Sequence, residues 1–228
     1  AKDKDEEYSK EKFDEVLSLN VDQIVKRQLE VGIDYISDGE MSKISYATYI
    51  KDRIDGFSGE SERRAPADLD DFPEYKEKIA KSGGTPTYSR PCCTNELKIK
   101  DEISLLNDIS NFNTSLKKFN HTKAFMNAAS PGVINVFMPN KFYNSDDDYL
   151  NKLSNIMASE YEKITAANIQ VQLDCPDLAL ARHMNFKDLT EDEFLKRAEI
   201  QIECLNTALE NVDIEMTRMH ICWGNYEG

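Results

Sequence analysis

A histidine and a cysteine stand two residues apart near the end of the 228-residue sequence, where they could bind a metal ion. His220 and Cys222 follow a short segment, 215–219, that predicts a β-strand. Residues two apart on a strand point the same way, so an imidazole nitrogen and a thiolate sulfur would reach one point in space. These are two of the donors that zinc prefers. The sequence therefore predicts half of a zinc site, and we expect the other half beyond residue 228.

The elements that would carry such a site alternate between strand and helix patterns. We expect five strands, at 33–36, 87–94, 124–129, 169–174 and 215–222. Apolar residues recur at three- and four-residue intervals between them, which indicates amphipathic helices. Thr190 to Glu193 has the residue types of a capping box and predicts the start of one helix. Repeated strand and helix units favour an α/β fold with a parallel sheet or barrel.

Polar or small side chains stand at or just past the carboxyl ends of these strands: Glu40, Ser130, Asp174, His220 and Cys222. A (β/α)8 barrel builds its active site at that end of the strands. A doubly wound sheet does so too, but no glycine-rich dinucleotide fingerprint follows any strand here. We therefore expect a barrel. Five strands make it incomplete, which indicates that residues are missing at both ends.

The predicted organisation is a single partial barrel domain over residues 1–228. Two long excursions, at about 41–86 and 131–149, interrupt it, and Ser130-Pro131-Gly132 predicts a turn that opens the second. Excursions of this length in a compact domain are more often functional than idle.

Composition limits the classes of partner and compartment. The chain has 28 basic and 42 acidic side chains and a net charge of −14, which argues against nucleic acid and anionic membranes as partners. No window approaches the roughly 18–20 apolar residues of a membrane span, and no segment resembles a signal peptide. We expect a cytoplasmic protein. The five cysteines are an odd number without a disulfide framework, so we expect reduced thiols.

Several motifs in order resemble the cobalamin-independent methionine synthase family. They are Gly32-Ile33-Asp34 through Asp38-Gly39-Glu40, Ser45-Tyr46-Ala47-Thr48-Tyr49, Ala128-Ala129-Ser130-Pro131-Gly132, Gln172-Leu173-Asp174-Cys175-Pro176-Asp177-Leu178-Ala179, and the segment 220–228. The resemblance is closer to the short, single-barrel members labelled methionine synthase II-like, and extends to the epoxyalkane:coenzyme M transferases. It covers about residues 20–228.

This resemblance implies a TIM-type barrel of the methionine synthase and uroporphyrinogen decarboxylase type, in which zinc binds the substrate thiol. His220 and Cys222 match the family's His-x-Cys ligand pair, and a glutamate and a cysteine would follow beyond residue 228. Glu40 and Asp174 match carboxylates that hold the amino-acid substrate. Cys175 replaces the glutamate of the family's Asp-Glu-Pro motif, and the opening strand would precede residue 1.

Three further residues are candidates for the substrate pocket, two of them with a structural alternative. Ser130 would face substrate or serve the turn, and His183 would line the pocket or start a helix. Asn225 follows the ligand pair and would line the pocket. Thiol alkylation at a metal needs no amino-acid nucleophile or acid–base pair, so we expect no catalytic residue beyond the metal site.

The predicted function is zinc-dependent transfer of a methyl or other alkyl group to a thiol, with homocysteine giving methionine as the default. The partners would be a homocysteine-like thiol and an alkyl donor, methyl-folate or another, and a homo-oligomer is compatible with these features. Three alternatives share the fold: alkylation of another thiol such as coenzyme M, a metal-free decarboxylase of the uroporphyrinogen type, and a non-catalytic barrel that binds a corrinoid or thiol.

Overall fold

A parallel β-sheet forms the centre of the computed structural model, which describes residues 7–61, 67–82 and 90–223. The four strands are β1 (Ile36–Ser37), β4 (Ala124–Ala129), β5 (Gln170–Asp174) and β6 (Thr217–His220). Their order is β1-β4-β5-β6 and every neighbouring pair is parallel. Strands and helices alternate along the chain, as predicted, and the sheet has the form of an incomplete barrel.

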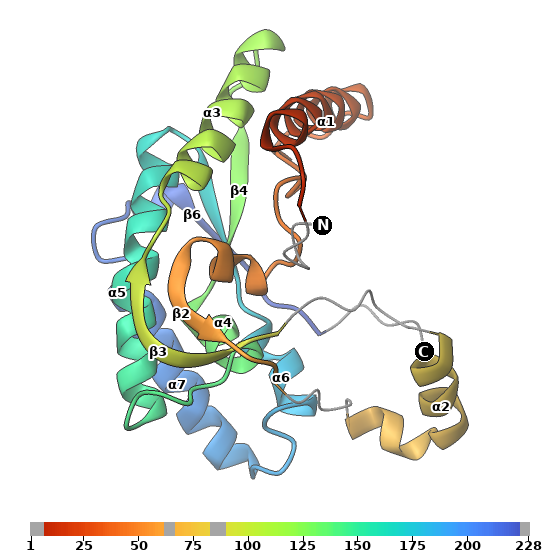
Figure 1. Cartoon of the computed structure of the whole chain (residues 1–228), viewed down its shortest axis with the longest axis vertical. Helices are drawn as coiled ribbons and strands as arrows, with labels where there is room; N and C mark the ends of the chain where they lie inside the picture. The colour runs from red at the N-terminus through yellow and green to blue at the C-terminus, as the bar shows by residue number, and fades with distance from the viewer. Residues whose placement is uncertain (1–6, 62–66, 83–89, 224–228) are drawn as a thin grey trace.

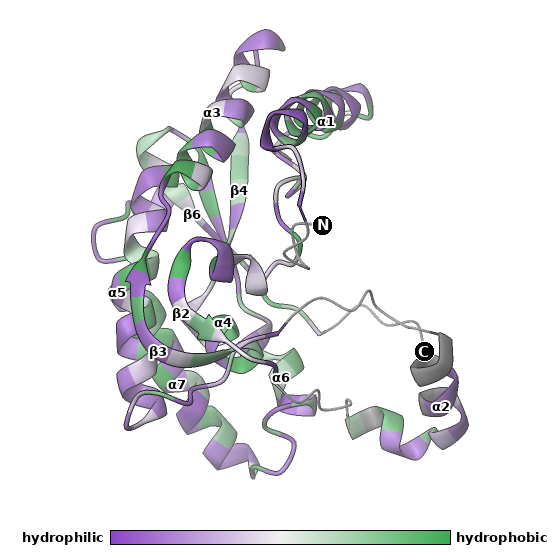
Figure 2. Cartoon of the chain, viewed as in Figure 1, coloured by the Kyte–Doolittle hydropathy of each residue, from purple (hydrophilic) through white to green (hydrophobic). Residues whose placement is uncertain are grey.

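Long helices connect the strands and cover the sheet. They are α1 (Lys10–Glu30), α3 (Ile103–Lys118), α5 (Asp146–Ala166) and α7 (Glu191–Ala208). Helix α5 packs against β4 and β5 with α7 beside it, and α1 lies next to α3 (Figure 1). In Figure 2, α1 carries apolar residues on one side and polar residues on the other. No helix in the described part of the chain is both long and apolar enough to cross a bilayer.

Side chains cap the first turns of these helices. Ser9 accepts a hydrogen bond from Lys12 N at the start of α1, and Ser145 caps α5 in the same way. Thr190 and Glu193 form the predicted capping box at the start of α7. Such caps satisfy backbone N–H groups that have no partner within the helix, each contributing about 1 kcal/mol.

The two faces of the sheet differ in chemistry. Alternate residues such as Ile36, Met126, Ala128, Val171 and Leu173 are at most 2% exposed and face the helices. The residues between them form the other face, and we call them the polar face: Ser37, Phe125, Asn127, Gln170, Gln172, Asp174, Arg218 and His220. The Arg218 guanidinium lies 4.1 Å from the ring centre of Phe125, two strands away, which confirms that they share this face. The polar face is where a barrel has its interior.

One predicted strand belongs to a separate, two-stranded antiparallel sheet. The sequence predicts a strand of the main sheet at 87–94, but β3 (Cys92–Ile99) pairs with β2 (Ile54–Ser58) in this two-stranded sheet. The register shifts at Gly56, whose φ is 107°. A Cβ there would lie 2.8 Å from Leu97 Cδ2 and 2.9 Å from Asn95 O, so only glycine fits. Residues 87–89 lie outside the described part of the chain.

The predicted excursions contain short helices. The first holds η2 (Thr48–Asp52), η3 (Ala67–Asp71) and α2 (Pro73–Ser82), and Figure 1 shows α2 well separated from the sheet and its covering helices. The remaining short elements are η4 (Pro176–Leu178), α6 (Leu180–His183) and η5 (Ile214–Met216). The five cysteines all lie within the described ranges, and none of them forms a disulfide.

The turn predicted at 130–132 is instead the start of α4 (Pro131–Phe137), which is buried throughout. Ser130 Oγ accepts from Val133 N and donates to Asp177 Oδ1 at 2.8 Å. Gly132 is required because a Cβ there would lie 2.0 Å from Asp177 Oδ2. Both amide atoms of nearby Gln201 are buried without a hydrogen-bond partner. Burial raises the pKa of Asp177 to about 6, although Ser130 opposes the shift.

A buried ion network joins the first excursion to the helices. Arg53 donates from Nη1 to Glu160 Oε2 at 2.9 Å and from Nη2 to Asp108 Oδ2 at 2.6 Å. Tyr49 donates its hydroxyl hydrogen to Glu160 and accepts from Ala129 N at the end of β4. All three charged side chains are less than 9% exposed. The network thus ties the 48–53 segment to α3, α5 and the carboxyl end of β4.

Replacing Arg53 tests the network. Arg53→Met leaves Glu160 and Asp108 buried without a cation, so we expect a loss of about 3–5 kcal/mol in the free energy of unfolding. Urea denaturation at neutral pH measures it. The matched control, Lys118→Met, breaks an ion pair with Asp22 in which the lysine is 57% exposed, and should cost less than about 1 kcal/mol. Similar losses in the two variants would contradict a special role for Arg53.

Asp177 predicts a pH dependence of stability. Its folded pKa of about 6 lies above the ordinary 3.8, so the folded state binds this proton more tightly. The charge therefore destabilises the fold above pH 6, and that cost disappears as the pH falls towards 4. Asp177→Asn should stabilise the protein, with a gain that grows by about 2–3 kcal/mol between pH 4 and pH 7. Denaturant titrations at the two pH values measure the gain. A gain that is equal at both, or that also appears in the exposed control Asp55→Asn, would contradict the assignment.

Candidate active site

The carboxyl ends of β5 and β6 bring Asp174 and His220 together. They are the last residues of their strands and are partners in the parallel register. Side chains of such partners project from the same face of a sheet. Asp174 is 5% exposed, whereas His220 is exposed. Two residues that the sequence selects as site candidates are thus neighbours on the polar face.

The backbone continues in the same direction beyond β6. Cys175 N donates to His220 O at 2.9 Å, and Leu180 N donates to Cys222 O at 3.0 Å. Both carbonyls thus accept hydrogen bonds from the segment 175–180. That the two side chains leave the backbone on one side stays a prediction of the His-x-Cys spacing, because β6 ends at His220. Cys222 is partly exposed.

These two donors form part of a metal site at most. Among the residues that the structure describes, no group of three or more His, Cys, Asp and Glu side chains could hold a metal ion. An imidazole and a thiolate suit zinc chemically, but a tetrahedral site needs further ligands. The two donor types fit zinc, and the metal stays a prediction.

Asp174 is held in place by two amides of the polar face. Asn127 Nδ2 donates to Asp174 Oδ2 at 3.1 Å, and Gln172 Nε2 donates to Oδ1 at 3.3 Å. Neither amide residue is among the site residues predicted from the sequence. Their signal was the alternation of polar and apolar residues in β4 and β5, which marks a face that packs against no helix.

Glu40 lies in the loop that follows β1, at the same end of the parallel sheet. It has a left-handed backbone with φ of 53°, and its N–H donates to Asp38 Oδ1 at 3.1 Å. Burial raises the pKa of the Glu40 carboxyl; the Lys43 ammonium lowers it, and Asp174 and Asp38 raise it further. Glu40 and Asp174, 134 residues apart in sequence (174 − 40), therefore lie within electrostatic reach of each other.

The other three sequence candidates have different surroundings. Ser130 is 1% exposed, and its hydroxyl is used by Val133 and Asp177, so it serves the start of α4. His183 ends α6, and its ring centre lies 5.0 Å from that of Trp223, close to the ligand pair. Asn225 lies outside the described residues.

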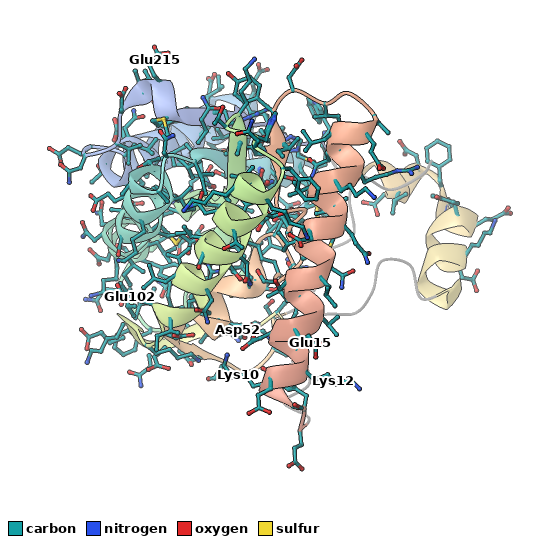
Figure 3. The ribbon with its side chains drawn as sticks, turned by 90° about the horizontal axis from the view of Figure 1, so that it is seen from above. Lys10, Lys12, Glu15, Asp52, Glu102 and Glu215 are labelled. Carbon is teal, nitrogen blue, oxygen red and sulfur yellow. The ribbon has the colours of Figure 1, made fainter. Side chains whose placement is uncertain are left out.

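A separate cavity of about 650 Å³ lies between the starts of α1 and α3. Its walls are mainly polar and include Lys10, Lys43, Asp52 and Asn107. Figure 3 shows α1 and α3 side by side, with Lys10 and Asp52 near the foot of α1. Glu40, Asp174 and His220 do not line this cavity, so its size does not make it the chemical site. Lys43 lines this cavity and also donates to the carbonyl of Asn127 on β4.

Comparison with known proteins gives relatives of one kind, and no family model matches the chain. A methionine synthase from Sulfolobus acidocaldarius is 23% identical over 219 residues, which cover 96% of this chain and 54% of the relative. One from Sulfurisphaera tokodaii is 23% identical over 201 residues, covering 86% and 48%.

A solved structure agrees with these relatives. The B12-independent methionine synthase from Shewanella sp. W3-18-1, determined in complex with selenomethionine, superposes with a TM-score of 0.65 at 19% identity. The match covers 91% of this chain and 52% of that one, so the chain spans about half the length of the proteins it resembles. The likeness confirms the predicted barrel-type fold. Together with the two archaeal relatives, it agrees with the resemblance to the cobalamin-independent methionine synthase family that the motifs predict.

Proposed function

We propose that this chain carries part of the active site of an enzyme that transfers a methyl group to the thiol of a homocysteine-like amino acid. The observation that carries the proposal is the convergence of Glu40, Asp174 and His220 at one end of a parallel sheet. The names of the relatives support methyl transfer, and the selenomethionine complex supports an amino acid of this size as ligand.

The two carboxylates would hold the substrate. A homocysteine-like molecule carries an ammonium group, and Asp174 with Glu40 offers it charge-assisted hydrogen bonds in a partly buried place. Asn127 and Gln172 would keep Asp174 oriented, because their amides already donate to it. Holding the ammonium at a fixed point directs the thiol towards the end of β6.

His220 and Cys222 would supply two of the ligands of a zinc ion. A free thiol has a pKa of about 8.5 and is mostly protonated at neutral pH; when bound, zinc favours the thiolate of the substrate and holds it in one orientation. In the proposed transfer the substrate sulfur, having lost its proton, would form a bond to the methyl carbon while the bond between methyl and donor breaks. The donor would leave with that electron pair and take up a proton. Positioning of this kind can lower the activation free energy by about 7 kcal/mol or more. Methyl-folate is the proposed donor.

Ligand binding tests the substrate site. We expect L-methionine to bind the chain in calorimetry, and Asp174→Asn to weaken binding about tenfold or more, because a charge-assisted contact is lost. The control Asp52→Asn alters an acid that lines the 650 Å³ cavity and should leave the affinity unchanged. The reverse pattern would move the ligand site to the cavity and contradict the proposal.

Metal binding tests the ligand pair. Cobalt(II) added to the reduced chain should give thiolate-to-metal absorbance, which Cys222→Ser abolishes and His220→Ala weakens. The matched controls are Cys204→Ser, at a thiol that is 6% exposed, and His121→Ala, whose imidazole contacts Asp34 O and Lys123 O. Absorbance that survives Cys222→Ser would contradict this ligand assignment.

A further inference from the structure

Lys43 is a buried cation beside the candidate site that the proposed chemistry does not yet use. Its side chain is 4% exposed, and Nζ lies 3.7 Å from Glu40 Oε1. The same ammonium donates to Asn127 O and lies 4.4 Å from the centre of the Tyr49 ring. Burial of an ammonium is costly unless hydrogen bonds and an opposite charge offset it. Glu40 provides that charge.

The contacts of Lys43 connect the two substrate carboxylates. Lys43 bonds to the carbonyl of Asn127, and the side chain of Asn127 donates to Asp174. Glu40, Lys43, Asn127 and Asp174 therefore form one continuous chain of contacts from the loop after β1 to the end of β5. The position of Glu40 relative to Asp174 depends on the two middle members.

Glu40 itself is in an unfavourable state that a ligand would relieve. Its backbone is left-handed, a conformation that costs a non-glycine residue energy. Its Oε1 is buried and has no hydrogen-bond partner, since the Lys43 contact at 3.7 Å is longer than a hydrogen bond. Asp174 and Asp38 both repel its charge. An oriented acceptor with no donor points to a missing cationic group.

We propose that Lys43 is a positioning residue of the substrate site, which holds the Glu40 carboxylate ionised beside Asp174 so that the pair accepts the ammonium of an amino-acid substrate. The inference rests on the proposed function and adds a selectivity to it. Lys43 pairs with Glu40, whereas Asp174 accepts hydrogen bonds from the uncharged amides of Asn127 and Gln172. Asp174 thus keeps a carboxylate charge for a second ammonium. A thiol or thioether that lacks an amino group would gain nothing from this arrangement.

Calorimetry with two probes tests the selectivity. L-Methionine carries the ammonium and 4-(methylthio)butanoate lacks it. Lys43→Met should weaken L-methionine binding about tenfold or more and change the affinity for the butanoate less than about threefold. Lys43→Arg keeps the charge and should retain most of the selectivity. The matched control is Lys100→Met, which removes a lysine on the same cavity with a 3.7 Å contact to Asp55, and should leave both affinities unchanged.

Other results of this experiment would overturn the proposal. An equal loss for both probes would show that Lys43 only supports the fold, as would the same loss in Lys100→Met. The melting temperature of each variant is measured alongside. Should Lys43→Met fail to fold, Lys43→Gln keeps a donor for Asn127 O without the charge and carries the same expectation.

A second measurement needs no ligand and tests the role of Lys43 independently of the proposed function. Carbon-13 NMR of the Glu40 carboxyl follows its ionisation directly. Loss of an ammonium within about 4–6 Å should raise the pKa of Glu40 by about one unit or more in Lys43→Met, and Lys100→Met should not change it. A wild-type chain that binds neither probe would refute the methyltransfer site, and an unchanged pKa of Glu40 in Lys43→Met would refute the role of Lys43.

Discussion

The buried guanidinium of Arg53 is the constraint on which the candidate site depends. Two carboxylates from different helices, Asp108 on α3 and Glu160 on α5, share this one cation. A buried ion group of this kind adds little stability compared with apolar packing, but it tolerates few alternative arrangements. Through Tyr49, which contacts both Glu160 and Ala129 N, the network fixes the segment after β1 against the end of β4.

The position of that segment determines where its polar residues lie. The loop before Tyr49 carries Glu40 and Lys43, and Lys43 reaches the carbonyl of Asn127 on β4. The parallel register determines the other side of the site, because it places Asp174 opposite His220. This placement needs no contact between the two side chains. One side of the site is thus fixed by buried charges and the other by backbone hydrogen bonds. These are independent constraints that converge at the same edge.

The residues at strand ends could be predicted from the sequence, since the fold rule for parallel sheets depends only on strand order. Asp174 and His220 follow from it, and the capping box at Thr190 followed from local chemistry. The pairing of β2 with β3 could not be predicted, because a strand pattern does not reveal which strand is its partner. The sequence predicts a turn where α4 begins, although serine followed by proline is equally typical of a helix start.

Lys43 shows why the remaining part of the site was beyond the sequence. A lysine in a polar loop is normally solvated, and its burial here arises from the Tyr49 ring, the Asn127 carbonyl and the Glu40 carboxylate, which come from three places in the chain. Asn127 is likewise recognised as a residue of the site only once the strands are paired. The energetic cost is also visible only in three dimensions: Glu40 Oε1 is buried without a donor. A fold selected for stability alone would give that oxygen a donor, so binding of a ligand's ammonium explains why it lacks one in the protein.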